Sequence, residues 1–211
     1  MRRVLVAGNG DLPPWGVLAP WLRRADTVVA ADGGANRLLA LGIEPHHVVG
    51  DLDSILGSTR RRIPAPRIHR RSDPNHTDLE KALDFAERRG ARDFTVMGVS
   101  EGRLDHVSAA LAILVERSAR LAIRFVDSEF TTQVVRGRLR FRAPVGTLLS
   151  LYAPSQARGV RSKGLRWPLE GKTLRPGSRG IHNEVCSNPV EISVGGGELL
   201  VMRGHRVSPH R

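Results

Sequence analysis

The chain has 211 residues, of which 40% are hydrophobic and 26% charged, as expected for a folded protein of one or two domains. Its net charge of +12 raises the question of a nucleic-acid partner, but aromatic residues make up only 4%, the basic residues are dispersed, and no nucleic-acid-binding motif is present. The single cysteine excludes an internal disulfide, and no apolar run approaches the roughly 18 residues of a membrane span. We therefore expect a cytoplasmic protein with neither a nucleic-acid nor a membrane partner.

The first half of the chain alternates short β-branched runs with segments of helical period. The predicted strands cover residues 2–8, 27–33, 47–51, 67–69, 93–98 and 121–127. Apolar residues at helical spacing predict helices at 15–24, 35–42, 77–90 and 104–119. The stretch "RRRIP" at 60–64 is typical of a solvated turn. This alternation predicts a doubly wound parallel α/β domain over residues 1–127.

After about residue 127 the helical period disappears. Strand-like runs follow at 131–135, 138–143, 147–153, 159–165, 179–185, 190–194 and 198–202. Turns rich in glycine and proline separate them. The pattern predicts an antiparallel β-sandwich over residues 128–211.

Acidic residues follow the predicted parallel strands near the points where those strands end. They are Asp32, Asp51, Asp53, Asp78 and Asp105. Because ligands of open parallel sheets bind outside the carboxyl ends of the strands, we expect these side chains to gather at one edge of the sheet. Helix capping is the structural alternative, both for the acids and serine of "GDLDS" and for "TDLE" at 77–80, which matches a capping box.

Clustered carboxylates beside glycines and an arginine suit the binding of phosphates through a metal. Mg²⁺ prefers oxygen ligands and is usually held by one or two carboxylates together with substrate phosphates. Asp51 and Asp53 can present such oxygens, and Arg103, at a predicted helix start, can neutralise phosphate charge. The chain lacks the P-loop and the protein-kinase signatures, and "GNGD" at 8–11 is only half of a dinucleotide fingerprint. The sequence therefore predicts phosphoryl or pyrophosphoryl transfer.

Six motifs in order along the chain resemble those of the thiamine pyrophosphokinase (thiamine diphosphokinase) family. They are "ADGGANRL", "VVGDLDSI", "DPNHTDLEKAL", "GRLDHVSAAL", "SKGLRWPL" and "HNEV". The resemblance implies an ATP- and Mg²⁺-binding α/β domain, followed by a β-sandwich that binds thiamine and forms a homodimer. It implies transfer of diphosphate from ATP to the hydroxyl of thiamine, which gives thiamine diphosphate and AMP. It further implies that the thiamine sites lie between subunits.

Carried over motif by motif, the resemblance assigns roles to individual residues. The implied metal ligands are Asp51, Asp53, Asp78 and Asp105, which with Arg103 would be the catalytic residues. The implied ATP and phosphate contacts are Asp32, Gly33, Gly34, Ser54, Thr77, Arg103 and His106. The implied thiamine contacts are Trp167, His182 and Asn183. An indole face suits a cationic aromatic ring, although without the resemblance a core position for Trp167 is the simpler interpretation.

The chain departs from the family pattern at three positions. His182 stands where the family usually has Ser, and Ala110 and Thr131 stand where it often has Asn. His182 and Thr131 bear on the acceptor, and a histidine can become charged near neutral pH beside a cationic acceptor. Diphosphate transfer to a different hydroxyl acceptor is therefore an alternative function. A basic nucleic-acid-binding protein is a more distant one.

Overall fold

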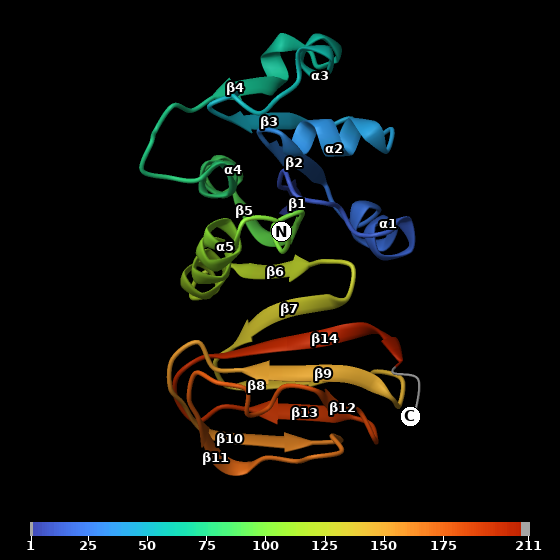
Figure 1. Ribbon diagram of the computed structural model, residues 1–211, viewed down its shortest axis with the longest axis vertical. Coiled ribbons are helices and arrows are strands. Elements are labelled where there is room, and N and C mark those ends of the chain that lie inside the picture. The colour runs from blue at the N-terminus through green and yellow to red at the C-terminus, as the bar shows by residue number, and fades with distance from the viewer. Residues whose placement is uncertain (1, 208–211) are drawn as a thin grey trace. The chain divides into compact units, whose positions relative to one another are not determined.

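The computed structural model describes residues 2–207, and the chain divides between Ser128 and Glu129 into two compact units (Figure 1). In chain order the first unit contains β1 (Arg2–Ala7), α1 (Trp15–Leu22), β2 (Thr27–Ala31), α2 (Gly34–Ala40), β3 (His47–Gly50), α3 (Gly57–Arg62), a 3-10 turn (Ala65–Arg67), β4 (Ile68–Arg70), α4 (Asp78–Glu87), β5 (Ala91–Met97), α5 (Leu104–Arg117) and β6 (Ala122–Val126). Its strands lie in the order β6-β5-β1-β2-β3-β4 and all pair in parallel.

Helices cover both faces of this sheet, because successive side chains of a strand point to opposite faces. On one face Leu5 of β1, Val28 of β2 and Val48 of β3 pack with Leu18 of α1 and Leu38 of α2. The helices α4 and α5 lie on the opposite side of the strands (Figure 1). The doubly wound α/β arrangement predicted from the sequence is therefore confirmed.

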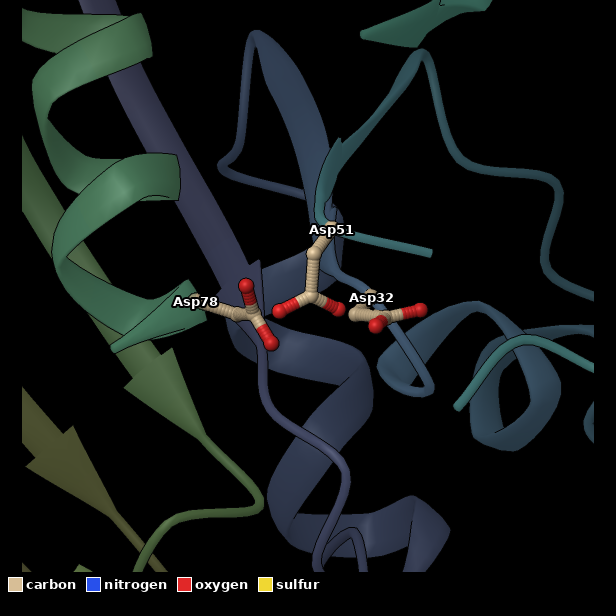
Figure 2. Close-up of side chains that lie close together, drawn as sticks. All are labelled: Asp32, Asp51 and Asp78. Carbon is tan, nitrogen blue, oxygen red and sulfur yellow. The ribbon is translucent and has the colours of Figure 1, made fainter. Parts of the chain in front are cut away.

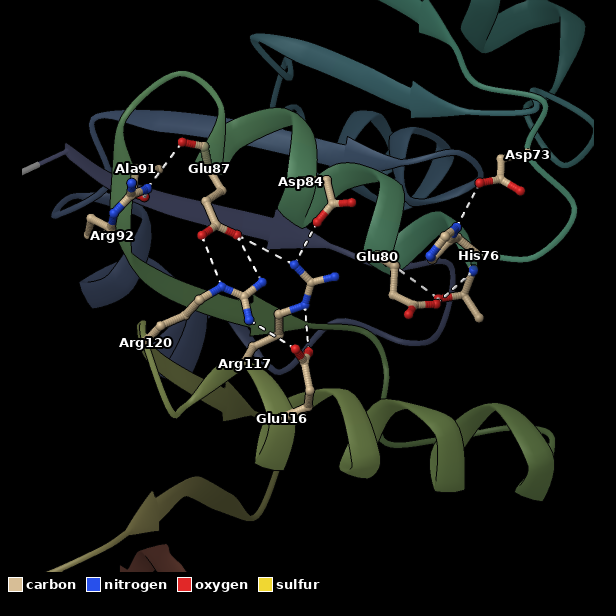
Figure 3. A network of polar contacts seen from close by, with 11 residues as sticks. Asp73, His76, Glu80, Asp84, Glu87, Ala91, Arg92, Glu116, Arg117 and Arg120 are labelled. Atoms are coloured by element: carbon tan, nitrogen blue, oxygen red, sulfur yellow. Dashed lines mark hydrogen bonds and ion pairs between the residues drawn. The ribbon is translucent and has the colours of Figure 1, made fainter.

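A buried arginine ties α4 to α5 (Figure 3). Arg117 of α5 is 8% exposed, and its guanidinium lies 2.6 Å from Asp84 and 3.4 Å from Glu87, both on α4. Glu116 contacts Arg117 at 2.8 Å, and Arg120 contacts both Glu87 and Glu116. Because a charge is tolerated in the interior only when it is paired, this network holds the two helices in a fixed relation.

Three local expectations were wrong. Residues Gly57–Arg62 form α3 rather than a turn, although the arginines at 60–62 are exposed. The N-cap of α3 is Leu56, which makes no side-chain cap, so the helix-capping alternative for "GDLDS" is also wrong. The strand β11 (Glu170–Leu174) was missed because its first four residues are exposed and show no apolar alternation.

The second unit is a sandwich of two antiparallel sheets. Its remaining strands are β7 (Phe130–Val135), β8 (Arg138–Phe141), β9 (Thr147–Tyr152), β10 (Ala157–Lys163), β12 (Asn183–Glu184), β13 (Val190–Ser193) and β14 (Leu199–Val207). In one layer the strands lie in the order β12-β9-β14-β7, and the other layer is a four-stranded sheet with the order β11-β10-β13-β8. Leu151 and Leu199 of the first sheet pack in one core with Val160 and Ile192 of the second, which confirms the predicted β-sandwich. Within residues 2–207, no helix is long and apolar enough to cross a membrane.

Candidate active site

A cavity of about 730 Å³ opens at the carboxyl ends of the parallel strands. Its walls come from the segments that follow β1, β2, β3 and β5, from the first turn of α4, from Arg37 of α2, and from one side of α5 as far as Ile113. The strand order reverses between β1 and β5, and open α/β sheets bind ligands at such a switch point. The cavity therefore lies at the edge of the sheet where the sequence placed the acids.

Three aspartates meet in this cavity (Figure 2). Carboxylate oxygens of Asp32, Asp51 and Asp78 all lie within 4.8 Å of one another, and among the described residues this is the one such group with the ligand types of a metal site. Asp32 follows β2, Asp51 follows β3, and Asp78 is the first residue of α4. Thr77 begins α4 through a capping box with Glu80, as predicted, and so sets the place of Asp78.

Gly50 leaves room for the three carboxylates to approach one another. A Cβ atom at this position would lie 2.7 Å from Cβ of Asp32 and 3.1 Å from Oδ1 of Asp78, both too close for ordinary contact. The last residue of β3 must therefore lack a side chain if Asp32 and Asp78 are to keep their positions.

Asp32 has an unsatisfied oxygen. The residue is 2% exposed, and while Oδ2 accepts the N–H of Ser54 at 3.3 Å, Oδ1 is buried without a hydrogen-bond partner. Burial, with Asp78 and Asp51 adding to it, raises the pKa of Asp32 to about 6. A buried carboxylate oxygen with no donor needs a cation or a proton, so the three carboxylates and the unpartnered Oδ1 both fit a hard divalent metal.

Lys81 is a site residue that sequence reasoning missed. It is 8% exposed, and its Nζ lies 2.9 Å from Oδ1 of Asp78 and 3.5 Å from Oδ2 of Asp51. Burial lowers the pKa of Lys81, but the hydrogen bond and charge of Asp78, and then those of Asp51, outweigh burial and raise it. Burial raises the pKa of Asp51, but the backbone N–H of Asp53 and then the charge of Lys81 outweigh burial and hold this pKa below its ordinary value. Spacing could have identified Lys81 from the sequence, because it lies three residues after Asp78 and thus on the same face of the helix.

Among residues 2–207, three residues other than glycine have a positive φ, and each lies in a predicted motif. They are Asp32 at 42°, Leu52 at 72° and His182 at 65°. Such backbone is uncommon outside glycine and concentrates at functional sites, where surrounding contacts hold it. Leu52 separates Asp51 from Asp53, so its left-handed backbone decides where each of the two side chains points.

Asp53 and Asp105 lie outside the three-aspartate cluster. Asp53 braces the loop, since its N–H donates to Oδ1 of Asp51 at 3.2 Å and its Oδ1 accepts the hydroxyl of Ser54 at 2.8 Å. Asp105 is exposed and does not line the cavity; Arg103 binds it through two hydrogen bonds of 3.1 and 2.6 Å. The hydrogen bond from Arg103 lowers the pKa of Asp105 to about 2.

All but one of the other predicted phosphate contacts line the cavity, and the exception lies behind its wall. Gly33, Ser54, Thr77, Arg103 and His106 line the cavity, and Gly34 does not. A Cβ at Gly34 would meet the carbonyl oxygen of Ala7 at 2.1 Å, so this glycine lets α2 start against the end of β1.

Two residues of the "ADGGANRL" motif that were not predicted as site residues also shape the site. Asn36 donates to the carbonyl of Ser54 at 2.9 Å and accepts the N–H of Leu56 at 3.0 Å, so it holds the "GDLDS" loop in place. Arg37 lines the cavity, where it contacts Asp11 at 3.0 Å and donates to the carbonyl of Asn9 at 3.0 Å. The cavity is also lined by residues that the sequence did not predict as site residues, among them Asn9, Asp11, His76 and Glu101.

In the second unit, Trp167 is presented on the surface. It is 56% exposed, so the core interpretation of this tryptophan is wrong. Asn183 is buried and holds the backbone of Trp167, accepting its N–H at 3.1 Å and donating to its carbonyl at 2.7 Å. The guanidinium of Arg166 lies 5.5 Å from the centre of the indole ring. The N–H of His182 donates to the hydroxyl of Ser150 at 3.0 Å. Asn183 therefore fixes the loop that displays the ring.

Comparisons with known proteins bear on both units. The sequence model described as thiamin pyrophosphokinase, catalytic domain, matches residues 18–125. The thiamine pyrophosphokinase of Bacillus subtilis (strain 168) is 33% identical over 183 residues, which cover 83% of this chain and 86% of that protein. A crystal structure of thiamine pyrophosphokinase from Bacillus subtilis aligns with a TM-score of 0.83 at 24% identity, over 97% of this chain and 100% of that one. Thiamin pyrophosphokinase from Candida albicans aligns with a TM-score of 0.84 at 15% identity, over 96% and 89%.

The two structures show a shared fold across both units. The family match covers the segment that contains the three-aspartate cluster and Lys81, and the sequence relative extends over most of the chain. The chain belongs to the thiamine pyrophosphokinase family.

Proposed function

We propose that the protein transfers the diphosphate group of ATP to the hydroxyl of thiamine, with release of AMP, and that it uses Mg²⁺ held at the three-aspartate cluster. The observation that carries this proposal is the convergence of Asp32, Asp51 and Asp78 around the partnerless Oδ1 of Asp32, at the switch point of the sheet. Family membership supports the choice of substrates.

The cavity combines the two kinds of charge that a triphosphate needs. Asp32, Asp51 and Asp78 would hold the metal, which when bound would neutralise negative charge on the β- and γ-phosphates. Arg37 and Arg103 lie on the cavity wall, where their guanidinium groups can bind phosphate oxygens. A volume of about 730 Å³ lies within the range of small-molecule sites, and it gives a nucleotide room.

We assign these residues positioning and charge neutralisation rather than covalent chemistry. In the transfer, the thiamine hydroxyl loses its proton to solvent and its oxygen bonds to the β-phosphorus of ATP. The bond from that phosphorus to the oxygen bridging to the α-phosphate breaks, and AMP leaves with that oxygen. Such reactions depend mainly on aligned reactants and stabilised charge. Asn36 and Ser54 serve this by holding the loop that carries Asp51.

We assign thiamine binding to the exposed indole of Trp167 in the second unit, because the π-face of an indole attracts a cationic ring. Asn183 then acts through Trp167, since its amide is already bonded to that backbone. The proposal includes a homodimer, testable by mass in solution, and a cytoplasmic location that rests on the single unpaired Cys186.

The purified protein should form thiamine diphosphate and AMP in equal amounts from ATP and thiamine, and only with Mg²⁺ present. Chromatographic separation of the four compounds over time measures both products. A reaction with a chelator in place of Mg²⁺ is the control. Mg²⁺-dependent AMP release without thiamine diphosphate would contradict thiamine as the acceptor, and no release of AMP under any condition would contradict the transfer itself.

A further inference from the structure

The acidic cluster already contains one cation of its own. The Nζ of Lys81 lies within hydrogen-bonding distance of Asp78, at 2.9 Å, and contacts Asp51 at 3.5 Å. The side chain is 7% exposed and lines the cavity, so the charge is neither a solvated surface lysine nor remote from the site. Burying an ammonium group is costly, and the surrounding carboxylates must compensate for that cost.

The lysine leaves the cluster unevenly satisfied. Lys81 contacts one oxygen of Asp51 and one of Asp78, whereas Oδ1 of Asp32 is buried with no partner. Three carboxylates face one ammonium group, so fully ionised they carry a net charge of −2. One side of the cluster is thus neutralised within the protein, and the Asp32 side is left for a cation from outside.

We propose that Lys81 is the fixed counter-ion of the acidic cluster. This inference rests on the proposed metal site: the ammonium group holds Asp51 and Asp78 together before a metal arrives and lowers the affinity of the cluster for a bare divalent cation. A metal that is bound only weakly by the protein alone binds firmly when the phosphates of ATP supply further ligands. Lys81 therefore favours the metal–nucleotide complex over the free ion as the species that binds.

The chain offers a matched control in Arg117. Like Lys81, it is a cation that is 8% exposed and is held by more than one carboxylate; its partners are Asp84 and Glu87 of α4 and Glu116 of α5. Unlike Lys81, it does not line the cavity. Loss of either cation should lower stability, because it leaves partly buried carboxylates uncompensated. Only loss of Lys81 should change metal binding.

The test measures Mn²⁺ binding to the metal-free protein by electron paramagnetic resonance, at low ionic strength and without nucleotide or thiamine. Lys81→Met should bind Mn²⁺ at least about tenfold more tightly than the wild type, since it removes a positive charge close to a divalent ion. Arg117→Met and the charge-preserving Lys81→Arg should keep the wild-type affinity. Unchanged or weaker binding in Lys81→Met would overturn the inference, and so would tighter binding in Lys81→Arg.

Thermal unfolding keeps the test decisive if the variant folds poorly. The melting temperature of Lys81→Met should rise more on addition of Mn²⁺ than that of the wild type or Arg117→Met, because the ion replaces the lost charge. If Lys81→Met folds only with Mn²⁺ present, the inference is supported; if Mn²⁺ does not restore it, the inference fails. Neither readout uses turnover, so failure of the proposed reaction would be seen separately in the assay of thiamine diphosphate.

Discussion

Gly50→Ala adds a single methyl group at the point where the carboxylates converge. The new carbon would lie 2.7 Å from Cβ of Asp32 and 3.1 Å from Oδ1 of Asp78, where carbon atoms normally stay about 3.5 to 4.0 Å apart. Asp32 must therefore retreat by about 1 Å. Because Asp32 is 2% exposed and its backbone has a φ of 42°, the residue has little freedom to move without disturbing its neighbours.

The expected cost has two parts. Overpacking of a well-packed site costs about 1–3 kcal/mol, so the free energy of unfolding should fall by that amount. The displaced carboxylates should also bind Mn²⁺ less tightly, and each loss of about 1.4 kcal/mol in binding free energy weakens the affinity tenfold. Turnover should fall further than affinity, because a catalytic group misplaced by about 1 Å can cost about a hundredfold in rate.

Urea unfolding followed by circular dichroism, together with Mn²⁺ titration, measures both effects. Gly16→Ala is the matched control: a Cβ at Gly16 meets no heavy atom within 4 Å, and the residue lies in α1. This variant should gain up to about 1 kcal/mol from helix propensity and leave Mn²⁺ binding unchanged. If Gly50→Ala kept both wild-type stability and wild-type Mn²⁺ affinity, the claim that Gly50 makes room for the cluster would be refuted.

Three more variants test other parts of the molecule. Asp51→Asn should lower turnover by at least about a hundredfold while far-ultraviolet circular dichroism stays native, since it removes charge that holds the metal; near-normal turnover would contradict the assignment. Trp167→Ala should raise the KM for thiamine and leave that for ATP unchanged in steady-state kinetics, with little loss of stability because the ring is 56% exposed. Burial lowers the pKa values of His47 and His69; the charge of His69 and then that of Arg89 lower the pKa of His47 further, and the charge of Arg89 lowers that of His69. The unfolded chain therefore binds more protons than the folded one, and the free energy of unfolding should fall as pH drops below about 6.5. His69→Phe should reduce this pH dependence in urea titrations, and an unaltered slope would exclude His69 as a source.

The arrangement of the first unit was predictable because its strands carry a strong signal. Strands buried on both faces require β-branched runs such as "VVG", and the helices between them bury one apolar stripe each. The edge at which the acids gather followed from parallel strands alone. The helix α3 was not predictable in this way, because its six residues, "GSTRRR", bury only Thr59 and show no apolar stripe.

Which acids meet could not be read from the spacing of the motifs. Asp51 and Asp53 are separated by one residue, Leu52, whose left-handed backbone determines where each side chain points. Asp51 joins the cluster, and Asp53 braces the loop. Asp105 likewise follows a strand end, yet its carboxylate turns to Arg103, two residues away. Both outcomes depend on loop conformation and on short-range hydrogen bonds, which residue type and order leave open.

Burial of a charge does not by itself mark a functional site, as two cations of this chain show. Arg117 and Lys81 are equally buried, at 8%; Lys81 contacts two carboxylates, and Arg117 contacts three. Around Arg117 a second cation, Arg120, shares the carboxylates, so two cations face Asp84, Glu87 and Glu116 and a net charge of −1 remains. Around Lys81 one cation faces three carboxylates, a net charge of −2, and Oδ1 of Asp32 is the one carboxylate oxygen in residues 2–207 that is buried without a partner. An excess of buried negative charge costs stability unless something outside the chain offsets it, which is why the cluster at Lys81, and not the one at Arg117, calls for a ligand.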